Sequence, residues 1–545
     1  MRRVIGDSNP WGKPSGQNEV RTSLFIIATS GRQHRSMLSS TLLNAAHRAD
    51  TYPTLGIDVG TSGVKALLLD GDRVIGTAHA PLLVSRPHPG WSEQEPEDWW
   101  TATCACLDVL AAAHPAALRA VRAIGLAGHM HGATLLDADG KVLRPCILWD
   151  DGRSAVQCAE LEAAVPALRA ITGNVAMPGF TAPKLLWVRQ HEPDVFARVR
   201  RVLLPKAWLR WRLCGEAIED MSDASGTLWL DVAGRRWSAE VLAACGLDES
   251  QMPRLVEGTM PAGELRAPWI ERWGFAQAPV IAGGAGDNAA GAVALGAVHP
   301  GDAFVSLGTS GVLWVTTARH AAAPDRGVHA FCHAVPNTWH QMGVLLSAAA
   351  SLSWWASCAG RDERQLLDEL PAQAERPAPC WFVPYLSGER TPHNDAAVRG
   401  AFLQLAADTS RPQMTQAVLE GVAHAFRDAR DALAGAGTRI EIADVIGGGA
   451  RSDLWCDVLA SMLNIPLRRL DDASHGPALG AARLALAALT GRSEFPRPRA
   501  ARIFEPRPAL VRRYDDAHAR WSPLYSLVRQ APGTAPTFNT SDSMS

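Results

Sequence analysis

The sequence predicts an α/β protein built from two related halves, and three observations lead to this prediction. Strand-like apolar segments alternate with helix-like segments along most of the chain, which is typical of mixed sheets flanked by helices. The peptide Gly-Thr-Ser-Gly-Val occurs twice, at residues 60–64 and 308–312, each time between two apolar strands. A length of 545 residues suits two large domains or three smaller ones. The two copies of the peptide, about 250 residues apart, indicate that each half opens with the same hairpin.

The composition is that of a globular protein and excludes several classes of function. Apolar residues make up 47% of the chain and charged residues 20%, and the formal net charge is −2. Without a long run of one charge sign, the chain has no electrostatic footprint for nucleic acid or for an acidic membrane surface. No apolar run approaches the roughly 18 residues that cross a bilayer. The ten cysteines form no Cys-x-x-Cys pair, so we expect reduced thiols and a cytoplasmic location.

The two ends of the chain differ in amino-acid composition from the rest. Residues 1–52 hold several Arg and Ser and few acids, which predicts a disordered extension or a start codon placed too early, with a transit or signal peptide as the alternative. The first convincing strand begins near Leu55. A break at His299-Pro300-Gly301 divides the remainder into an N-terminal domain, 53–298, and a C-terminal domain, 299–530. Residues 531–545 are predicted to be a flexible tail.

Both Gly-Thr-Ser-Gly turns are candidates for binding phosphate. Glycine lets backbone N–H groups approach a phosphate, and hydroxyl groups add further donors. A plain hairpin turn favours the same residue types, but one copy per half suits a cleft that grips phosphates from both sides. The pattern is neither a Walker loop nor a dinucleotide fingerprint. The candidates are Thr61, Ser62 and Lys65 in the first copy, and Gly308, Thr309 and Ser310 in the second.

Two carboxylates lie close to these turns in the sequence. Asp58, inside the first strand, either caps the turn or faces the phosphates and holds Mg²⁺ through water. Asp287 follows a Gly-Gly-Ala-Gly loop, at the start of a small-residue helix predicted to reach about Val298. It either caps that helix or accepts the proton of a hydroxyl group that is being phosphorylated.

Three further segments are candidates for binding ligands. Gly447, Gly448, Gly449 and Ala450 join a strand to a helix, as a tight turn or as a surface for a nucleotide. For His129-Met130-His131, contact with a sugar is favoured over a metal site. Trp149, beside two aspartates, offers a flat apolar face to a sugar, although an ordinary turn is the alternative.

The motifs together make the chain resemble the FGGY carbohydrate kinases. The stretches that carry this resemblance are 85–89, 91–94, 128–136, 177–184, 220–223 and 384–393, in addition to the turns and loops above. The resemblance implies two actin-like ATPase domains of the ribonuclease H-like fold, with ATP, Mg²⁺ and the sugar in a cleft between them. One departure is the loop before Asp287, Gly-Gly-Ala-Gly-Asp, where fewer residues or only glycine are expected.

The resemblance also implies a role for each candidate residue. Asp287 would be the general base that activates the C5 hydroxyl of D-xylulose, in D-xylose catabolism feeding the pentose phosphate pathway. Asp58 would lie near metal and phosphate. The sugar contacts would be Met130, His131, Trp149, Asp287 and Asn288; the nucleotide contacts would be Thr61, Ser62, Lys65, Gly308, Thr309, Ser310, Gly447, Gly448, Gly449 and Ala450.

Two alternatives remain open from the sequence. The sugar could instead be ribulose, gluconate or glycerol, or the chain could be a non-catalytic sugar sensor of the same architecture. A sensor would tolerate loss of the base, yet Asp287 is present. The expected partners are ATP and a small sugar, without nucleic acid or membrane, and a homodimer is left open.

Overall fold

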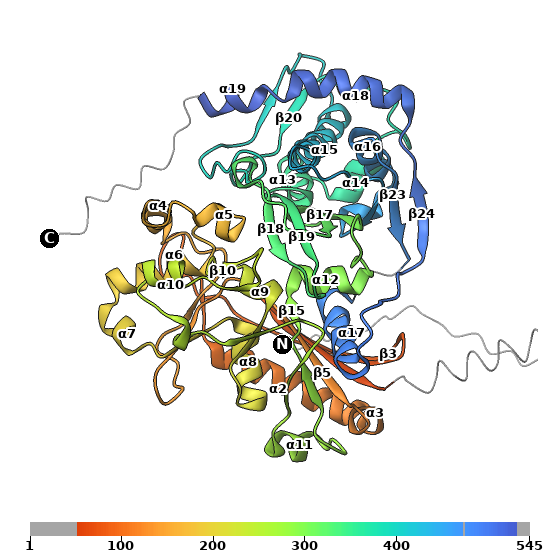
Figure 1. Cartoon of the computed structure of the whole chain (residues 1–545). Coiled ribbons are helices and arrows are strands. Elements are labelled where there is room, and N and C mark those ends of the chain that lie inside the picture. Colours follow the sequence, from red (N-terminus) through yellow and green to blue (C-terminus); the bar gives the residue numbers. More distant parts are fainter. Residues whose placement is uncertain (1–51, 472–474, 531–545) are drawn as a thin grey trace, which may run out of the picture. The chain divides into compact units, whose positions relative to one another are not determined.

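The computed structural model describes residues 52–471 and 475–530, which belong to one compact unit (Figure 1). The expectations for residues 1–51 and 531–545 lie outside this range. Two seven-stranded sheets, each with helices packed against it, form the framework. The predicted class, an α/β protein with two mixed sheets, is therefore confirmed.

The first sheet has the order β13-β14-β5-β1-β2-β3, with β15 also paired to β5. Two hairpins begin it, and the second turns at Gly71, whose φ of 58° favours glycine. The strands are β1 (Thr54–Gly60), β2 (Gly63–Asp70), β3 (Arg73–Pro81), β5 (Ala123–Gly128), β13 (Pro261–Glu264), β14 (Val280–Ala282) and β15 (Ala285–Gly286). Helices packed around it are α2 (Pro96–Ala113), α3 (Pro115–Arg119), α8 (Pro205–Cys214) and α11 (Ala267–Trp273).

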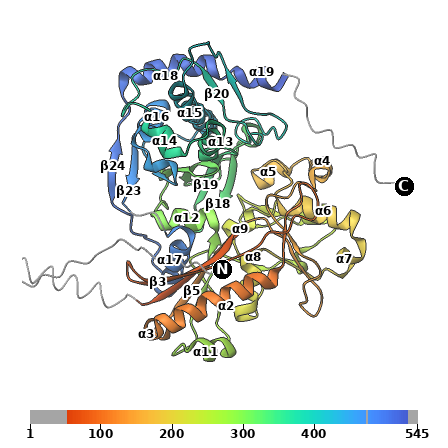
Figure 2. The same ribbon diagram turned by 180° about the vertical axis from the view of Figure 1, so that it is seen from behind.

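Alternating side chains of the first sheet meet different helices. Leu55 and Ile57 join the core that contains Trp99 of α2, which runs along one face of the sheet (Figure 2). Leu67 and Leu69 instead pack with α17 (Gly476–Thr490), on the other face. Because successive residues of a strand point to opposite faces, the apolar run of β2 from Ala66 to Leu69 follows from a sheet covered on both sides.

An insertion between β5 and β13 forms one wall of the candidate site. Its core includes Phe180, Trp187 and Trp229. Its elements, with the short β4 that pairs with β7, are β4 (Glu93–Gln94), β6 (Thr134–Leu136), β7 (Cys146–Ile147), α4 (Ala155–Ala164), α5 (Leu168–Thr172), α6 (Thr181–His191), α7 (Pro193–Arg198), β8 (Arg201–Leu203), β9 (Ile218–Asp220), α9 (Met221–Ser225), β10 (Leu230–Asp231), β11 (Arg236–Trp237), α10 (Ala239–Ala244), η1 (Glu249–Gln251) and β12 (Arg254–Val256).

The second sheet repeats the plan of the first. Its order is β18-β19-β17-β16-β22-β23-β24, and the parallel strand β22 lies beside the β16–β17 hairpin as β5 lies beside the β1–β2 hairpin. The elements are β16 (Ala303–Leu307), β17 (Gly311–Thr317), η2 (Pro324–Arg326), β18 (His329–Cys332), β19 (Trp339–Leu345), α13 (Ala349–Ala359), α14 (Glu363–Asp368), β20 (Trp381–Val383), β21 (Ala401–Leu403), α15 (Arg411–Gly435), β22 (Ala443–Ile446), η3 (Gly449–Arg451), α16 (Asp453–Leu463), β23 (Leu467–Leu470), β24 (Ala500–Phe504), α18 (Pro508–Trp521) and α19 (Leu524–Gln530).

Two helices connect the sheets, α17 and α12 (Asp287–Leu295). Although α17 comes late in the chain, it packs on β1 and β5 of the first sheet and on α12 (Figure 1). The approach requires glycine, since a Cβ on Gly125 would lie 1.8 Å from the Ala481 carbonyl oxygen, and one on Gly480 would lie 1.8 Å from that of Ala290. A helix from the C-terminal half of the chain therefore packs on the sheet of the N-terminal half.

Helix α12 ends at Leu295 rather than at about Val298, because Gly296 adopts a left-handed φ of 66° and closes the helix. All ten cysteines are free. Within residues 52–471 and 475–530, no helix combines the length and apolar character that a membrane span requires.

Candidate active site

Both predicted carboxylates lie at one edge of the first sheet. Strands β1, β5 and β15 are parallel, and Asp58, Ala127 and Ala285 occupy one row across them. The segment after β5 and the residue after β15, Asp287, therefore leave the sheet at the same edge. The register therefore brings Asp58 and Asp287 near each other, and burial followed by the charge of Asp287 raises the pKa of Asp58.

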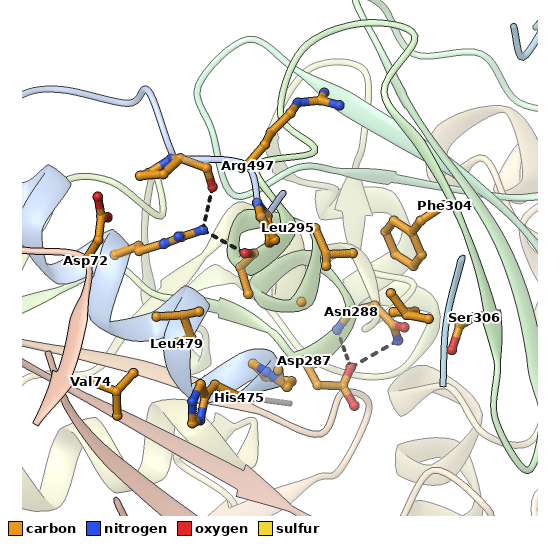
Figure 3. A pocket seen from close by; sticks show the side chains of 18 of the residues that line it. Asp72, Val74, Asp287, Asn288, Leu295, Phe304, Ser306, His475, Leu479 and Arg497 are labelled. Carbon is orange, nitrogen blue, oxygen red and sulfur yellow. Dashed lines mark hydrogen bonds between the residues drawn. The ribbon is translucent and has the colours of Figure 1, made fainter. Parts of the chain in front are cut away.

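Asp287 is the first residue of α12 and does not cap it, because Gly286 occupies the capping position. Its Oδ1 accepts hydrogen bonds from the Asn288 backbone N–H at 2.7 Å and from Nδ2 of the same residue at 3.1 Å (Figure 3). Burial raises the pKa of Asp287 to about 6, although both bonds from Asn288 lower it. At neutral pH the carboxyl group is ionised and its pKa is close to the ambient pH, as a general base requires.

The loop before Asp287 makes two close approaches to other backbone segments. Gly284 has a φ of 73°, and a Cβ there would lie 2.1 Å from the Leu126 carbonyl oxygen. The next two residues form β15 against β5. The loop therefore contains a short strand, β15, and Asp287 follows it at the edge of the sheet.

Asp58 is a carboxylate with an unsatisfied oxygen. Its Oδ1 is buried and has no hydrogen-bond partner among the described residues. Burial, followed by the charge of Asp287, raises the pKa of Asp58 to about 7, while Lys65, opposite it in the β1–β2 register, lowers it. An unsatisfied carboxylate oxygen at this edge fits Mg²⁺, which takes oxygen ligands and keeps several of its waters.

A cavity of about 270 Å³ lies beside Asp287 and has walls from both halves of the chain. This size suits a small sugar. The residues lining it are Met130, His131, Trp149, Met177, Gly179 and Phe180 from the first half, then Asp287 and Asn288, and Ser310, Val312, His329, Phe331, Met342, Val344 and Arg390 from the second half. All five sugar contacts predicted from the sequence therefore lie together.

His131 offers this cavity a hydrogen-bond acceptor. Its Nδ1 lies 2.7 Å from the Gly226 carbonyl oxygen, which can only accept, so Nδ1 carries the proton. Burial lowers the pKa of His131 to about 3, which leaves the ring neutral and Nε2 free to accept from a hydroxyl group. The Lys184 ammonium donates to the His131 carbonyl oxygen at 3.0 Å and fixes the backbone, whose φ is 75°. His129 points elsewhere, against Trp99, although residues i and i+2 of an extended strand share a face, because β5 ends at Gly128 and His131 has a positive φ.

Met130 and Trp149 are held by specific contacts. A Cβ on Gly226 would lie 2.9 Å from Met130 Cε, and one on Gly286 would lie 2.8 Å from its Cγ, so two glycines make room for this side chain. The Trp149 Nε1–H donates to Thr61 Oγ1 at 3.0 Å. Because Trp149 also lines the cavity, this bond places the first Gly-Thr-Ser turn beside it.

The second Gly-Thr-Ser turn lies between the cavity and the third glycine loop. Ser310 lines the cavity, and the carbonyl oxygens of Gly308 and Thr309 accept from the first backbone N–H groups of α13. Gly447, with a φ of 94°, lies so close that a Cβ there would be 3.0 Å from the Gly308 nitrogen. The predicted turn and loop therefore form one surface.

A cavity of about 1300 Å³ adjoins this surface. Gly448 and Gly449 line it, together with residues of α13, α14 and α16. Its volume and its glycine floor suit a nucleoside. Gly447 and Ala450 do not line it; Ala450 is buried beneath the loop.

Another cavity, of about 610 Å³, runs from Asp287 along α12 (Figure 3). Its lining includes Gly291, Leu295, His475 and Arg483. Asp287 and Asn288 thus border two cavities, one on each side of the start of α12.

A buried group of charges supports the Asp287 loop, and the sequence did not reveal its role. The Gly286 N–H donates to Ser222 Oγ at 3.1 Å, and Ser222 Oγ donates to Asp220 Oδ1. The Lys206 ammonium lies 2.7 Å from Asp220 Oδ2 and 3.4 Å from Asp223 Oδ2, and also pairs with Glu219. These three acids could hold a metal ion by their spacing, but the ammonium group already lies among them. In the sequence, the one indication of this group was the stretch 220–223, which contributes to the family resemblance.

Comparisons with known proteins agree with this geometry. Sequence profiles described as the N-terminal and C-terminal domains of the FGGY family of carbohydrate kinases match residues 53–294 and 303–489. The chain belongs to this family. It is 51% identical to xylulose kinase of Escherichia coli (strain K12) over 433 residues, which is 79% of this chain and 89% of that protein.

Solved structures show the same likeness. The crystal structure of a xyloylose kinase from Brucella ovis is 53% identical, covers 88% of this chain and 99% of its own, and superimposes with a TM-score of 0.86. A gluconate kinase from Lactobacillus acidophilus, 23% identical, covers 88% of this chain and 99% of its own with a TM-score of 0.82. The second likeness concerns the fold alone.

Proposed function

We propose that this chain is an ATP-dependent kinase that converts D-xylulose into D-xylulose 5-phosphate, with Asp287 as the general base. The observation that carries the proposal is the position of Asp287, which borders the sugar-sized cavity while the two Gly-Thr-Ser turns adjoin that same cavity. Identity of about one half to xylulose kinases supports D-xylulose over ribulose, gluconate or glycerol.

The reaction is an in-line transfer of the terminal phosphoryl group. Asp287 accepts the proton of the sugar hydroxyl while the oxygen of that hydroxyl forms a bond to the γ-phosphorus. The bond between the γ-phosphorus and the β,γ-bridging oxygen breaks, which releases ADP. The His131 Nε2 accepts a sugar hydroxyl, and Asn288 holds the base in place. Mg²⁺ held near Asp58 would supply positive charge to the phosphates.

The nucleotide would lie mainly on the second half. Gly448 and Gly449 would face the nucleoside in the cavity of about 1300 Å³, and Thr309 and Ser310 would donate to the phosphates, with Thr61, Ser62 and Lys65 opposite them. We accordingly assign sugar binding and the base to a domain of residues 53–298 and nucleotide binding to 299–530, although α17 packs on the first sheet.

A panel of acceptors tests the proposal. ADP release is measured with D-xylulose, D-ribulose, D-gluconate and glycerol, with and without Mg²⁺. A site whose polar groups match one set of hydroxyls should give kcat/KM for D-xylulose at least about a hundredfold above the others, and no activity without Mg²⁺. A higher kcat/KM for another acceptor would replace the proposed sugar, and no release with any of them would favour the sensor.

A further inference from the structure

Arg390 is the one arginine in the lining of the 270 Å³ cavity, and no role for it was predicted from the sequence. It lies in the loop between β20 and β21, so it reaches the cavity from the second half of the chain, whereas Met130, His131 and Trp149 come from the first. Among the residues that the structure describes, its guanidinium has neither a hydrogen bond nor an ion pair.

The backbone on both sides of Arg390 is firmly anchored. The Thr391 N–H donates to the Val344 carbonyl oxygen at 3.0 Å, and the Val344 N–H donates to Thr391 Oγ1 at 2.9 Å. On the other side, Glu389 Oε1 accepts from the N–H groups of Leu346 at 3.0 Å and Arg390 at 2.7 Å. A side chain held on so fixed a segment is positioned before a ligand arrives.

The charge of Arg390 is not offset by its neighbour. Burial raises the pKa of Glu389 to about 8, so most of this carboxyl is protonated at neutral pH. A guanidinium with five N–H donors, without a hydrogen bond in a half-buried position, is costly unless a ligand supplies acceptors. The cavity therefore needs acceptor atoms near Arg390.

The position of Arg390 in the cavity decides whether its donors face the sugar or the transferred phosphoryl group. Burial, and after it the charge of Arg390, lowers the pKa of His131 and of His329, which both line the cavity. The pKa of Asp287, in contrast, is set by burial and by Asn288. The backbone agrees, since Thr391 Oγ1 donates to the Gly327 carbonyl oxygen, two residues before His329. Arg390 therefore lies on the His329 side of the cavity, nearer to His329 than to Asp287.

We propose that Arg390 is a specificity-determining residue that donates hydrogen bonds to oxygen atoms at the end of the bound ketose remote from the hydroxyl activated by Asp287. The inference rests on the proposed function and deepens it by naming a contact from the second half. Under it, the bound sugar bridges both halves of the chain, since His131 contacts it from one side and Arg390 from the other.

Substitution combined with substrate analogues tests this contact. Arg390→Met keeps the apolar stem but removes all donors, and Arg390→Lys keeps the charge. The analogues are 1-deoxy-D-xylulose, which lacks the hydroxyl on C1, and xylitol, which has a hydroxyl in place of the carbonyl oxygen on C2. Loss of a charged hydrogen bond should lower kcat/KM for D-xylulose about ten- to a hundredfold in Arg390→Met, with a smaller loss in Arg390→Lys. The KM for ATP should stay within about twofold of the wild-type value.

The decisive readout is discrimination between substrates. Wild-type enzyme should prefer D-xylulose over at least one analogue, and Arg390→Met should reduce that preference, because the oxygen no longer has its donor. Equal losses with all three substrates, or a rise in the KM for ATP alone, would overturn the inference in favour of a structural or phosphate-binding role.

Matched controls keep the outcome interpretable. Arg399→Met alters an exposed arginine of the same loop, whose Nη1 bonds only to backbone oxygens, and should leave all three kcat/KM values unchanged. If Arg390→Met does not fold, as thermal unfolding would show, Arg390→Lys carries the same comparison. A wild-type chain that releases no ADP with D-xylulose would refute the proposed function, and this inference with it; normal wild-type turnover with unchanged discrimination in Arg390→Met would refute the inference alone.

Discussion

Asp58 and Asp287 occupy neighbouring positions but differ in their surroundings. Asp287 has both amide donors of Asn288 on one oxygen, while Asp58 has a buried oxygen without any donor. Their pKa values are accordingly about 6 and about 7. The group with the lower pKa suits the base, and the unsatisfied one suits a cation, because environment decides which role each of two carboxylates takes.

The pKa of Asp287 predicts the acid side of the pH profile. A carboxyl group accepts a proton only when ionised, so kcat/KM should fall as the pH drops through about 6, approaching about tenfold per unit in more acid solution. Steady-state rates between pH 4.5 and 8 measure this. ATP affinity, measured over the same range, separates protonation of the nucleotide from that of Asp287; a profile flat down to pH 5 would contradict the assignment.

Asp58 should cost the protein stability when no ligand is bound. Its folded pKa of about 7 lies above the ordinary value of 3.8, so its favourable contribution is complete below 3.8 and is lost as the pH rises through 7. Asp58→Asn should therefore be more stable than wild type at pH 8 by roughly 1–4 kcal/mol, with almost no difference at pH 4. Thermal unfolding without Mg²⁺ or ATP measures this, and a variant that is less stable at pH 8 would show that Asp58 is satisfied.

Gly286 gives a further test at the scale of one side chain. A Cβ there would lie 2.8 Å from Met130 Cγ, which is near the backbone and cannot simply swing away. Gly286→Ala should raise the KM for D-xylulose about tenfold or more and leave the KM for ATP unchanged. Equal changes in both constants would indicate a general distortion instead.

At the scale of elements, α12 and α17 pack backbone against backbone near the site. Gly480→Ala would place a methyl group 1.8 Å from the Ala290 carbonyl oxygen and should destabilise the fold by at least about 2 kcal/mol. Gly291→Ala is the matched control, since no atom lies within 4 Å of a Cβ on this residue of α12, and it should be neutral or stabilising by up to about 1 kcal/mol. Urea unfolding of both variants decides; similar stabilities would contradict the packing.

Local elements were predictable from the sequence because their signals are local. The repeated peptide around Thr61 and Thr309 lies in two hairpins of the same kind, and the start of α12 at Asp287 follows from its glycine loop. The position of α17 was not predictable, because its small-residue face fits against Gly56 and Gly125, which lie more than three hundred positions earlier in the chain.

At the scale of the whole molecule, the site depends on contacts between distant segments. The sequence identified His131, Trp149 and Asp287 by their residue types and Met130 by the family resemblance, and the structure places all four at one cavity. It gave no role to Lys206 or Arg390, because a buried charge is recognised by what surrounds it, and those neighbours come from other parts of the chain. Residues that contact the ligand are thus easier to predict from a sequence than the residues that hold them in position.

The central claim is that Asp287 removes the proton of the acceptor hydroxyl, and Asp287→Asn tests it most directly. The amide keeps the size of the side chain but cannot accept the proton. Phosphate transfer from radiolabelled ATP to D-xylulose is measured in single turnovers, with ATP and sugar affinities measured separately by calorimetry and Asp139→Asn, an exposed carboxylate, as the control. We predict that Asp287→Asn binds both ligands within about threefold of wild type but transfers phosphate at least about a thousandfold more slowly. Transfer at a wild-type rate would contradict the account.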